Sequence, residues 1–183
     1  NMIGGEALKV LEKIETVEDA EIEVKREVFK IPQKKFPTVD EAKAMVKEAE
    51  EKVKELSSKG VKGPYLRVAM NNLVGAKLQL YLAEHVKGPI FPEEAEIQAI
   101  RINDTVLLGV PGELFTEFQI EIKEKSKFEK TFVIALANGY VGYIFTPEAY
   151  EKKVYETFVS PLEKDSGYLI RDVALNLINK MGL

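Results

Sequence analysis

The sequence lacks cysteine, and its 183 residues include one histidine, His85. Without cysteine the chain forms no disulfide, no cysteine-based zinc site, and no thiol-based catalytic site or redox switch. A single histidine excludes a zinc site that is built from several histidines of this chain. His85 lies near the expected end of a helix, where a histidine usually interacts with the helix dipole, so we do not expect it to bind metal.

Long apolar runs and an excess of basic charge are also missing. No stretch approaches the roughly 18–20 apolar residues that span a membrane, and the first residues show no signal peptide, so the compartment stays unassigned. The chain has 30 Asp and Glu residues against 26 Lys and Arg residues, a formal net charge of −4. Nucleic-acid binding needs a basic surface, so we expect no nucleic-acid partner.

The composition that is present is that of a globular protein, with 45% hydrophobic and 31% charged residues. The length predicts a single domain over residues 1–183. An α/β fold is expected, in which helices pack on a mixed β-sheet. Its strands are predicted over residues 20–31, 95–102, 105–110 and 131–137. We expect a bulge in the first strand near Arg26, and we expect the apolar last strand to be central and buried on both faces.

The helices are indicated by apolar positions at helical spacing and by their start signals. Thr38 and Glu41 form the two ends of a capping box, which predicts that a helix begins there. Pro64 stands where the first turn of a second helix tolerates proline. Residues 38–86 therefore predict a helical hairpin, which we expect as a lobe appended to the domain. Residues 4–15 also have helical spacing.

Two strand ends, in residues 108–113 and 137–143, are candidate sites for chemistry, because α/β proteins usually bind ligands at the carboxyl ends of strands. A Pro-Gly turn in the first segment can direct Glu113 into a cleft. The residues alone favour a structural interpretation, in which Glu113 lies at the start of a helix and interacts with the helix dipole. By the same reasoning, Tyr140 and Tyr143 are packing residues with hydroxyls paired at the surface.

A family resemblance changes this balance. The stretch from Gln98 to Tyr155 contains a strand that ends in GVPGE, a following helix, the segment TFVIALANGYVGY, the turn TPEAY and a YE pair. These motifs resemble the neutral/alkaline non-lysosomal ceramidase family, most specifically within residues 108–155. Members of that family are zinc amidohydrolases that cleave the N-acyl bond of ceramide. The resemblance implies that this chain is part of a larger α/β catalytic domain.

The resemblance also implies a site. It places two zinc ligands on Glu113 and Tyr143, with Tyr140 as the alternative tyrosine ligand, and it places Tyr155 beside the scissile amide. The two zinc-binding histidines of the family lie in an earlier part of its catalytic domain, and their motifs are missing from this chain. We therefore expect the C-terminal half of such a domain, a fragment or one subunit of a split protein, which holds half of the zinc ligand set and is inactive alone.

The expected partners follow from this interpretation. They are the N-terminal half of the same catalytic domain or a complementary subunit, and a lipid-like N-acyl substrate; a homo-oligomer also stays open. A half-domain should expose an apolar patch where the missing half docks. The alternative function is a non-catalytic interaction or structural module, in which Glu113 is only a carboxylate at a helix start. Ser160 is not expected to be a nucleophile, because no histidine is available as its base.

Overall fold

The computed structural model describes residues 2–88 and 92–182, which form a mixed α/β fold. Its centre is a four-stranded sheet with the strand order β1-β2-β3-β5. Neighbouring strands are antiparallel from β1 to β3, whereas β3 and β5 are parallel, so the sheet is mixed as predicted. The strands are β1 (Ile22–Lys30), β2 (Glu94–Ile102), β3 (Thr105–Gly109) and β5 (Lys130–Ile134).

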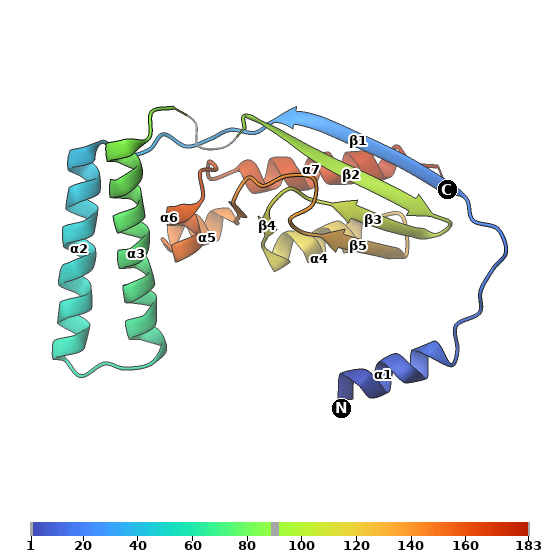
Figure 1. The fold of residues 1–183 in the computed structure, drawn as a ribbon, viewed down its shortest axis with the longest axis horizontal. Helices are drawn as coiled ribbons and strands as arrows, with labels where there is room; N and C mark the ends of the chain where they lie inside the picture. Colours follow the sequence, from blue (N-terminus) through green and yellow to red (C-terminus); the bar gives the residue numbers. More distant parts are fainter. Residues whose placement is uncertain (1, 89–91, 183) are drawn as a thin grey trace.

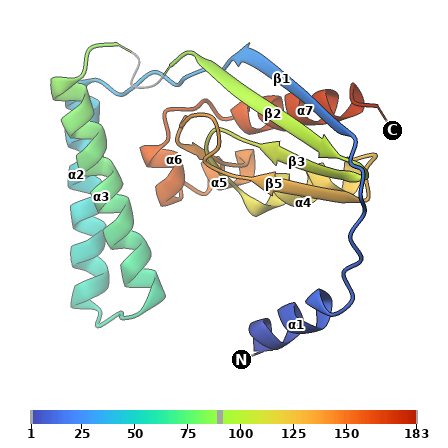
Figure 2. The ribbon, with the colours of Figure 1, turned by 45° about the vertical axis from the view of Figure 1, so that its right-hand side comes forward.

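One face of this sheet is covered by two helices, α4 (Thr116–Lys125) and α7 (Ser166–Asn179), which lie on the same side in Figures 1 and 2. The core fills the space between them and the sheet. Its fully buried side chains include Ile97, Val106, Leu108, Phe118, Ile122, Ile170 and Ile178. Two layers around one apolar core are enough to fix the positions of the strand ends that carry the site.

The first strand is regular, so the expected bulge near Arg26 is wrong. β1 pairs with β2 without interruption, from Ile22 opposite Ile102 to Lys30 opposite Glu94. The guanidinium of Arg26 lies on the uncovered face, 3.4 Å from the carboxylate of Glu96 on the neighbouring strand. Ile22, Val24 and Val28 also lie on the uncovered face, whereas Phe29 on the opposite side of the strand packs against the core.

The expectation of a central strand over residues 131–137 is also wrong. Within the part of the chain that the structure describes, β5 is an edge strand that pairs with β3 alone, and it ends at Ile134. Its apolar residues do not all reach the core, since Phe132 and Ile134 are 54% and 46% exposed. A continuous apolar run predicts burial on both faces only where both faces are covered, and here one face is not.

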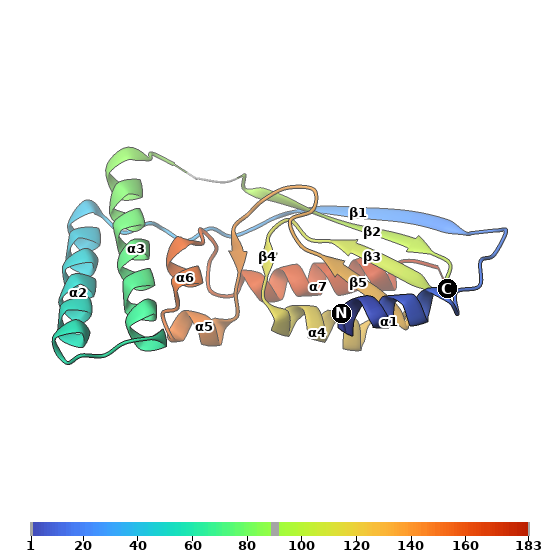
Figure 3. The same ribbon diagram turned by 60° about the horizontal axis from the view of Figure 1, so that its bottom comes forward.

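The predicted hairpin consists of α2 (Val39–Ser58) and α3 (Pro64–His85). The capping box at the start of α2 is present: the Glu41 backbone N–H donates to the Thr38 hydroxyl at 3.3 Å, and the Thr38 N–H donates to the Glu41 carboxylate at 2.8 Å. The two helices stand beside the sheet in Figures 1 and 3, and α3 packs against α6 (Tyr155–Val159).

The chain begins with α1 (Met2–Leu11), which has no buried residue and stands apart from the sheet in all three ribbon views. A connecting segment over residues 12–21 joins it to β1. Across residues 2–88 and 92–182, no helix is both long and apolar enough to cross a membrane.

Candidate functional site

Two very short strands bring the predicted site residues together. β4 (Glu113–Leu114) and β6 (Tyr143–Ile144) are parallel, with Glu113 directly opposite Tyr143. The Glu113 N–H donates to the Gly142 carbonyl at 3.0 Å, which fixes this register. Two-residue strands carry no periodicity, so the sequence did not predict them.

The placement of Glu113 in β4 corrects its expected position at a helix start. The next helix, α4, begins at Thr116, and the acidic residue of its first turn is Glu117. Interaction with the helix dipole fades within the first turn, so Glu117 and not Glu113 has that role. The half-buried Glu113 carboxylate is therefore available for other interactions.

Glycine allows the two loops of the site, residues 109–113 and 138–143, to approach each other closely. A Cβ atom on Gly112 would lie 2.6 Å from the carbonyl oxygen of Gly142, closer than packed atoms approach. Gly142 itself has a φ of 86°, a conformation that side chains rarely adopt. The Val141 N–H completes the link between the loops by donating to the Pro111 carbonyl at 2.8 Å. Gly112 thus permits the close backbone approach, and Gly142 supplies the backbone conformation on the other side of it.

Tyr140 contacts the Glu113 carboxylate directly. Its hydroxyl donates to Glu113 Oε1 at 2.8 Å. Burial, followed by the hydrogen bond to Glu113 and the charge of that group, raises the pKa of Tyr140 to about 12. At neutral pH the phenol is therefore protonated and orients the carboxylate.

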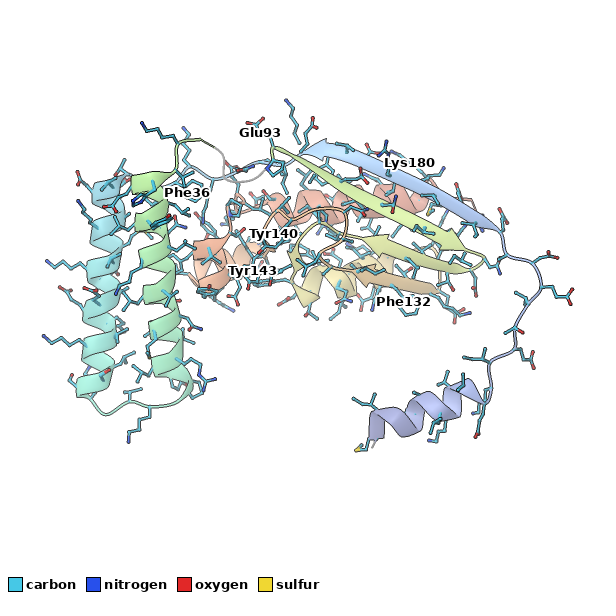
Figure 4. All side chains as sticks on the ribbon, in the orientation of Figure 1. Phe36, Glu93, Phe132, Tyr140, Tyr143 and Lys180 are labelled. Carbon is cyan, nitrogen blue, oxygen red and sulfur yellow. The ribbon has the colours of Figure 1, made fainter. Side chains whose placement is uncertain are left out.

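Tyr143 and Tyr155 form the other side of the site. Their ring centroids are 6.5 Å apart with an interplanar angle of 71°, an edge-to-face contact. Burial, and then the adjacent Glu113 carboxylate, raise the pKa of Tyr143. Tyr155 is the first residue of α6, a short helix that the sequence did not predict. Figure 4 shows Tyr140 and Tyr143 at the end of the sheet that faces the hairpin.

Ser160 supports the site through the backbone. Its fully buried hydroxyl donates to the Tyr143 carbonyl at 2.7 Å and accepts from the Leu162 N–H at 3.2 Å. The side chain is thus committed to two structural hydrogen bonds that hold β6 against the segment after α6.

The carboxylate of Glu113 and the hydroxyls of Tyr140, Tyr143 and Tyr155 are oxygen groups of the kind that can bind a metal ion. A carboxylate oxygen is a usual zinc ligand, and zinc sites in proteins are usually four-coordinate. Among the described residues there is no group of three or more histidine, aspartate or glutamate side chains that could hold a metal ion. His85 lies on α3, where its Nδ1 is 2.9 Å from the Tyr81 carbonyl oxygen and its ring stacks on that of Tyr81. At this position the described residues therefore offer Glu113, a carboxylate of the type that zinc accepts, but no complete zinc shell.

Comparison with known proteins gives a likeness of fold alone. No protein-family model matches the sequence, and no curated protein matches it. Among solved structures, a ceramidase complexed with C2 is similar with a TM-score of 0.47 and 20% identity, covering 52% of this chain and 16% of that one. Neutral ceramidase from Pseudomonas aeruginosa is similar with a TM-score of 0.42 and 24% identity, covering 51% and 16%. The likeness extends over about half of this chain, which corresponds to less than a fifth of each ceramidase chain.

Proposed function

We propose that this chain supplies the carboxylate-and-tyrosine half of a zinc amidase site that hydrolyses an N-acyl amide of the ceramide type. Glu113 and Tyr143 are the proposed metal ligands, with Tyr140 as the alternative tyrosine, and the remaining ligands come from the N-terminal half of the catalytic domain or from a complementary subunit. The observation that carries the proposal is the convergence on Glu113: Tyr140 donates to it at 2.8 Å, and Tyr143 lies opposite it in the β4–β6 pair.

The motifs and the geometry support this proposal independently. The residues that the sequence resemblance selects are separated by up to 42 positions (113 to 155), yet they meet at one end of the sheet. A carboxylate and phenols that share one small site are suited to binding a cation through oxygen. Burial, and then the adjacent Glu113 carboxylate, raise the pKa values of Tyr140 and Tyr143, so both phenols are protonated at neutral pH.

Each residue has a proposed task in the reaction. Glu113 and Tyr143 bind the metal, and the Tyr140 hydroxyl holds the Glu113 carboxylate in place. Tyr155 donates its hydroxyl proton in a hydrogen bond to the amide carbonyl oxygen, where negative charge develops during hydrolysis. A bound zinc ion supplies Lewis acidity for the same carbonyl.

The proposal is tested by measuring release of the acid from a short N-acyl amide in the presence of zinc, with free imidazole added to replace the missing histidine ligands. We expect release that depends on zinc, is lost in Glu113→Gln, and falls by about 10²-fold in Tyr155→Phe. Glu117→Gln makes the same chemical change four residues away on the exposed first turn of α4, and it should leave the rate unchanged. Equal rates in Glu113→Gln and the unchanged chain would contradict the proposal.

The alternative, a non-catalytic interaction module, is favoured by a different observation. The uncovered face of the sheet exposes large apolar side chains, among them Val24 and Phe132, which is typical of an interaction surface. Under this alternative, Glu113→Gln changes neither metal binding nor hydrolysis, whereas substitutions on the uncovered face change association. The two functions are therefore separated by which set of variants has an effect.

A further inference from the structure

The uncovered side of the four-stranded sheet, here called the outer face, carries an apolar region beside polar residues that include Arg26 and Gln98. The β-pair registers place one row straight across all four strands, formed by Val24, Ile100, Leu107 and Phe132. Ile22 and Ile102 extend it on one side. Val24 and Phe132, at the two ends of the row, are 55% and 54% exposed. A surface of this kind normally has a covering partner.

The helix α1 has an apolar face of its own that is equally uncovered. At 100° per residue, Ile3, Ala7, Val10 and Leu11 fall on one side of the helix. Glu6 lies at the edge of that side, and Lys9 falls on the other side together with Met2 and Leu8. The two charged residues pair with each other at 2.8 Å. Gly4 borders the apolar face and has no atom near the position of a Cβ, so the helix backbone can approach a flat surface closely there.

This helix needs a partner to remain folded. It has 10 residues, none of them buried, and isolated helices shorter than about 12–15 residues are marginal in water. Gly4 and Gly5 weaken it further, because glycine is among the poorest helix formers. An amphipathic helix of this composition obtains its stability from packing of its apolar face.

The connection to β1 puts α1 within reach of the outer face. The Glu21 carbonyl accepts from the Asn103 N–H at 2.9 Å, so the chain is fixed to the sheet from Glu21 onward. Residues 12–20 therefore form the tether, which can extend to about 30 Å. The helix is about 15 Å long, and the apolar row spans three strand spacings, or about 14 Å.

We propose that α1 docks with its apolar face on the outer face of its own sheet and forms a third layer of the fold. The tether favours its own chain over a second copy, because a short linker gives an effective concentration of the order of millimolar. The undocked position in Figure 1 and the docked one are then two positions of one tethered helix. The proposal does not depend on the function assigned to Glu113 and the tyrosines.

Disulfide trapping tests this directly, because the chain has no cysteine of its own. The test variant carries Ala7→Cys on the apolar face of α1 and Leu107→Cys in the middle of the row. Its matched control carries Lys9→Cys and Leu107→Cys, which keeps the tether and changes only the face of the helix. In the full chain at low concentration, we expect the intrachain disulfide to form about tenfold faster in the test variant than in the control.

Each result decides for or against the proposal. Equal rates in the two variants overturn it, because the tether alone then brings the segments together. Disulfides that form only between chains also overturn it and assign the outer face to a second copy. Hydrogen exchange tests the same proposal in chains without cysteine. The backbone amides of α1 should be protected in the unchanged chain and should lose that protection in Phe132→Lys. Phe132 is exposed, so this substitution does not disturb the core. Absence of protection in both chains overturns the proposal as well.

Discussion

At the scale of single residues, the pKa of Tyr140 is the quantity that depends most directly on the contacts within the candidate site. Its pKa lies near 12 because of burial and of Glu113, compared with an ordinary value of 10.0. The unfolded chain therefore loses this proton near pH 10, while the folded chain keeps it until about pH 12. Its contribution to stability is complete below pH 10 and is lost as the pH rises from 10 to 12. We expect the phenolate ultraviolet absorbance to show a late-titrating tyrosine that disappears in Tyr140→Phe.

The same titration measures how much Glu113 contributes to the raised pKa values of Tyr140 and Tyr143. In Glu113→Gln the carboxylate charge is removed but burial is kept, so the pKa of Tyr140 and that of Tyr143 should fall only part of the way toward their ordinary values. Glu117→Gln should leave both unchanged. A titration curve that is identical in Glu113→Gln and the unchanged chain would show that the carboxylate does not face the two phenols.

Through Lys34, the free energy of unfolding depends on pH with the opposite sign. Its ammonium donates to the carbonyls of Thr157 and Phe158 at 2.8 and 3.1 Å, which favours the charged form, yet burial dominates and lowers the pKa of Lys34 from 10.5 to about 8. The unfolded chain binds more protons than the folded one between those values. The free energy of unfolding should therefore increase from pH 8 toward pH 10, before the tyrosines titrate.

A variant isolates this effect. Lys34→Met should flatten the rise between pH 8 and 10, measured by denaturant unfolding at several pH values, whereas Lys35→Met at the exposed neighbouring position should keep it. A rise of equal slope in Lys34→Met would assign the pH dependence to another group.

At the scale of elements, the β4–β6 pair depends on the close approach at Gly112. A methyl group there would lie 2.6 Å from the Gly142 carbonyl oxygen, and because this neighbour is backbone, the two loops must separate. We expect Gly112→Ala to lower the free energy of unfolding by about 1–3 kcal/mol. Because the loops carry Glu113 and Tyr140, the variant should also lower the pKa of Tyr140.

Gly5→Ala is the control for that substitution. Gly5 lies in α1 with no atom near its Cβ position, so an added methyl meets no neighbour, and alanine is the better helix former. The variant should be at least as stable as the unchanged chain in the same denaturation measurement. Comparable destabilisation by both substitutions would mean that the close approach at Gly112 is not what makes glycine necessary.

The capping box gives a prediction for the hairpin alone. Thr38→Ala removes the acceptor for the Glu41 N–H at the start of α2 and should cost about 1 kcal/mol. Thr16→Ala, in the exposed segment before β1, should be neutral. If the two variants unfold at the same denaturant concentration, the cap does not limit the stability of the hairpin.

An element was predicted well where the interactions that form it involve residues close together in the sequence, and poorly where they involve distant segments. The capping box of Thr38 and Glu41 and the proline at Pro64 act within a few residues, so both hairpin helices were predicted close to their observed bounds. The edge position of β5 depends on which face of the sheet has a cover, and that information is not in residues 131–137. β4 and β6 exist only because the two loops meet, so no local pattern indicates them.

At the scale of the whole molecule, the predicted strand ends indicated residues 108–113 and 137–143 as candidate segments, and only the family resemblance assigned a chemical role to Glu113 and the tyrosines. Spacing alone favoured a helix-start interpretation of Glu113, which the β4 placement corrects. The hydrogen bond between Tyr140 and Glu113 was not predicted, since Tyr140 was expected only as the alternative tyrosine ligand. The fold of the NGYVGY segment depends on the left-handed Asn138 and on Gly142, which the spacing of the two tyrosines does not reveal. The alternation in residues 22–28 predicted that Ile22, Val24 and Val28 share one face of β1, but it does not indicate that this face lies away from the core.

The central claim is that Glu113 and Tyr143 face one metal ion, and the ultraviolet difference spectrum of tyrosine on adding zinc tests it most directly. Without metal, the raised pKa of Tyr143 keeps its phenol protonated near neutral pH. With zinc, and with imidazole in place of the missing ligands, we predict a phenolate band that Glu117→Gln retains and that Glu113→Gln and Tyr143→Phe lose. A spectrum that zinc leaves unchanged, or a band that persists in both of those variants, would contradict the account.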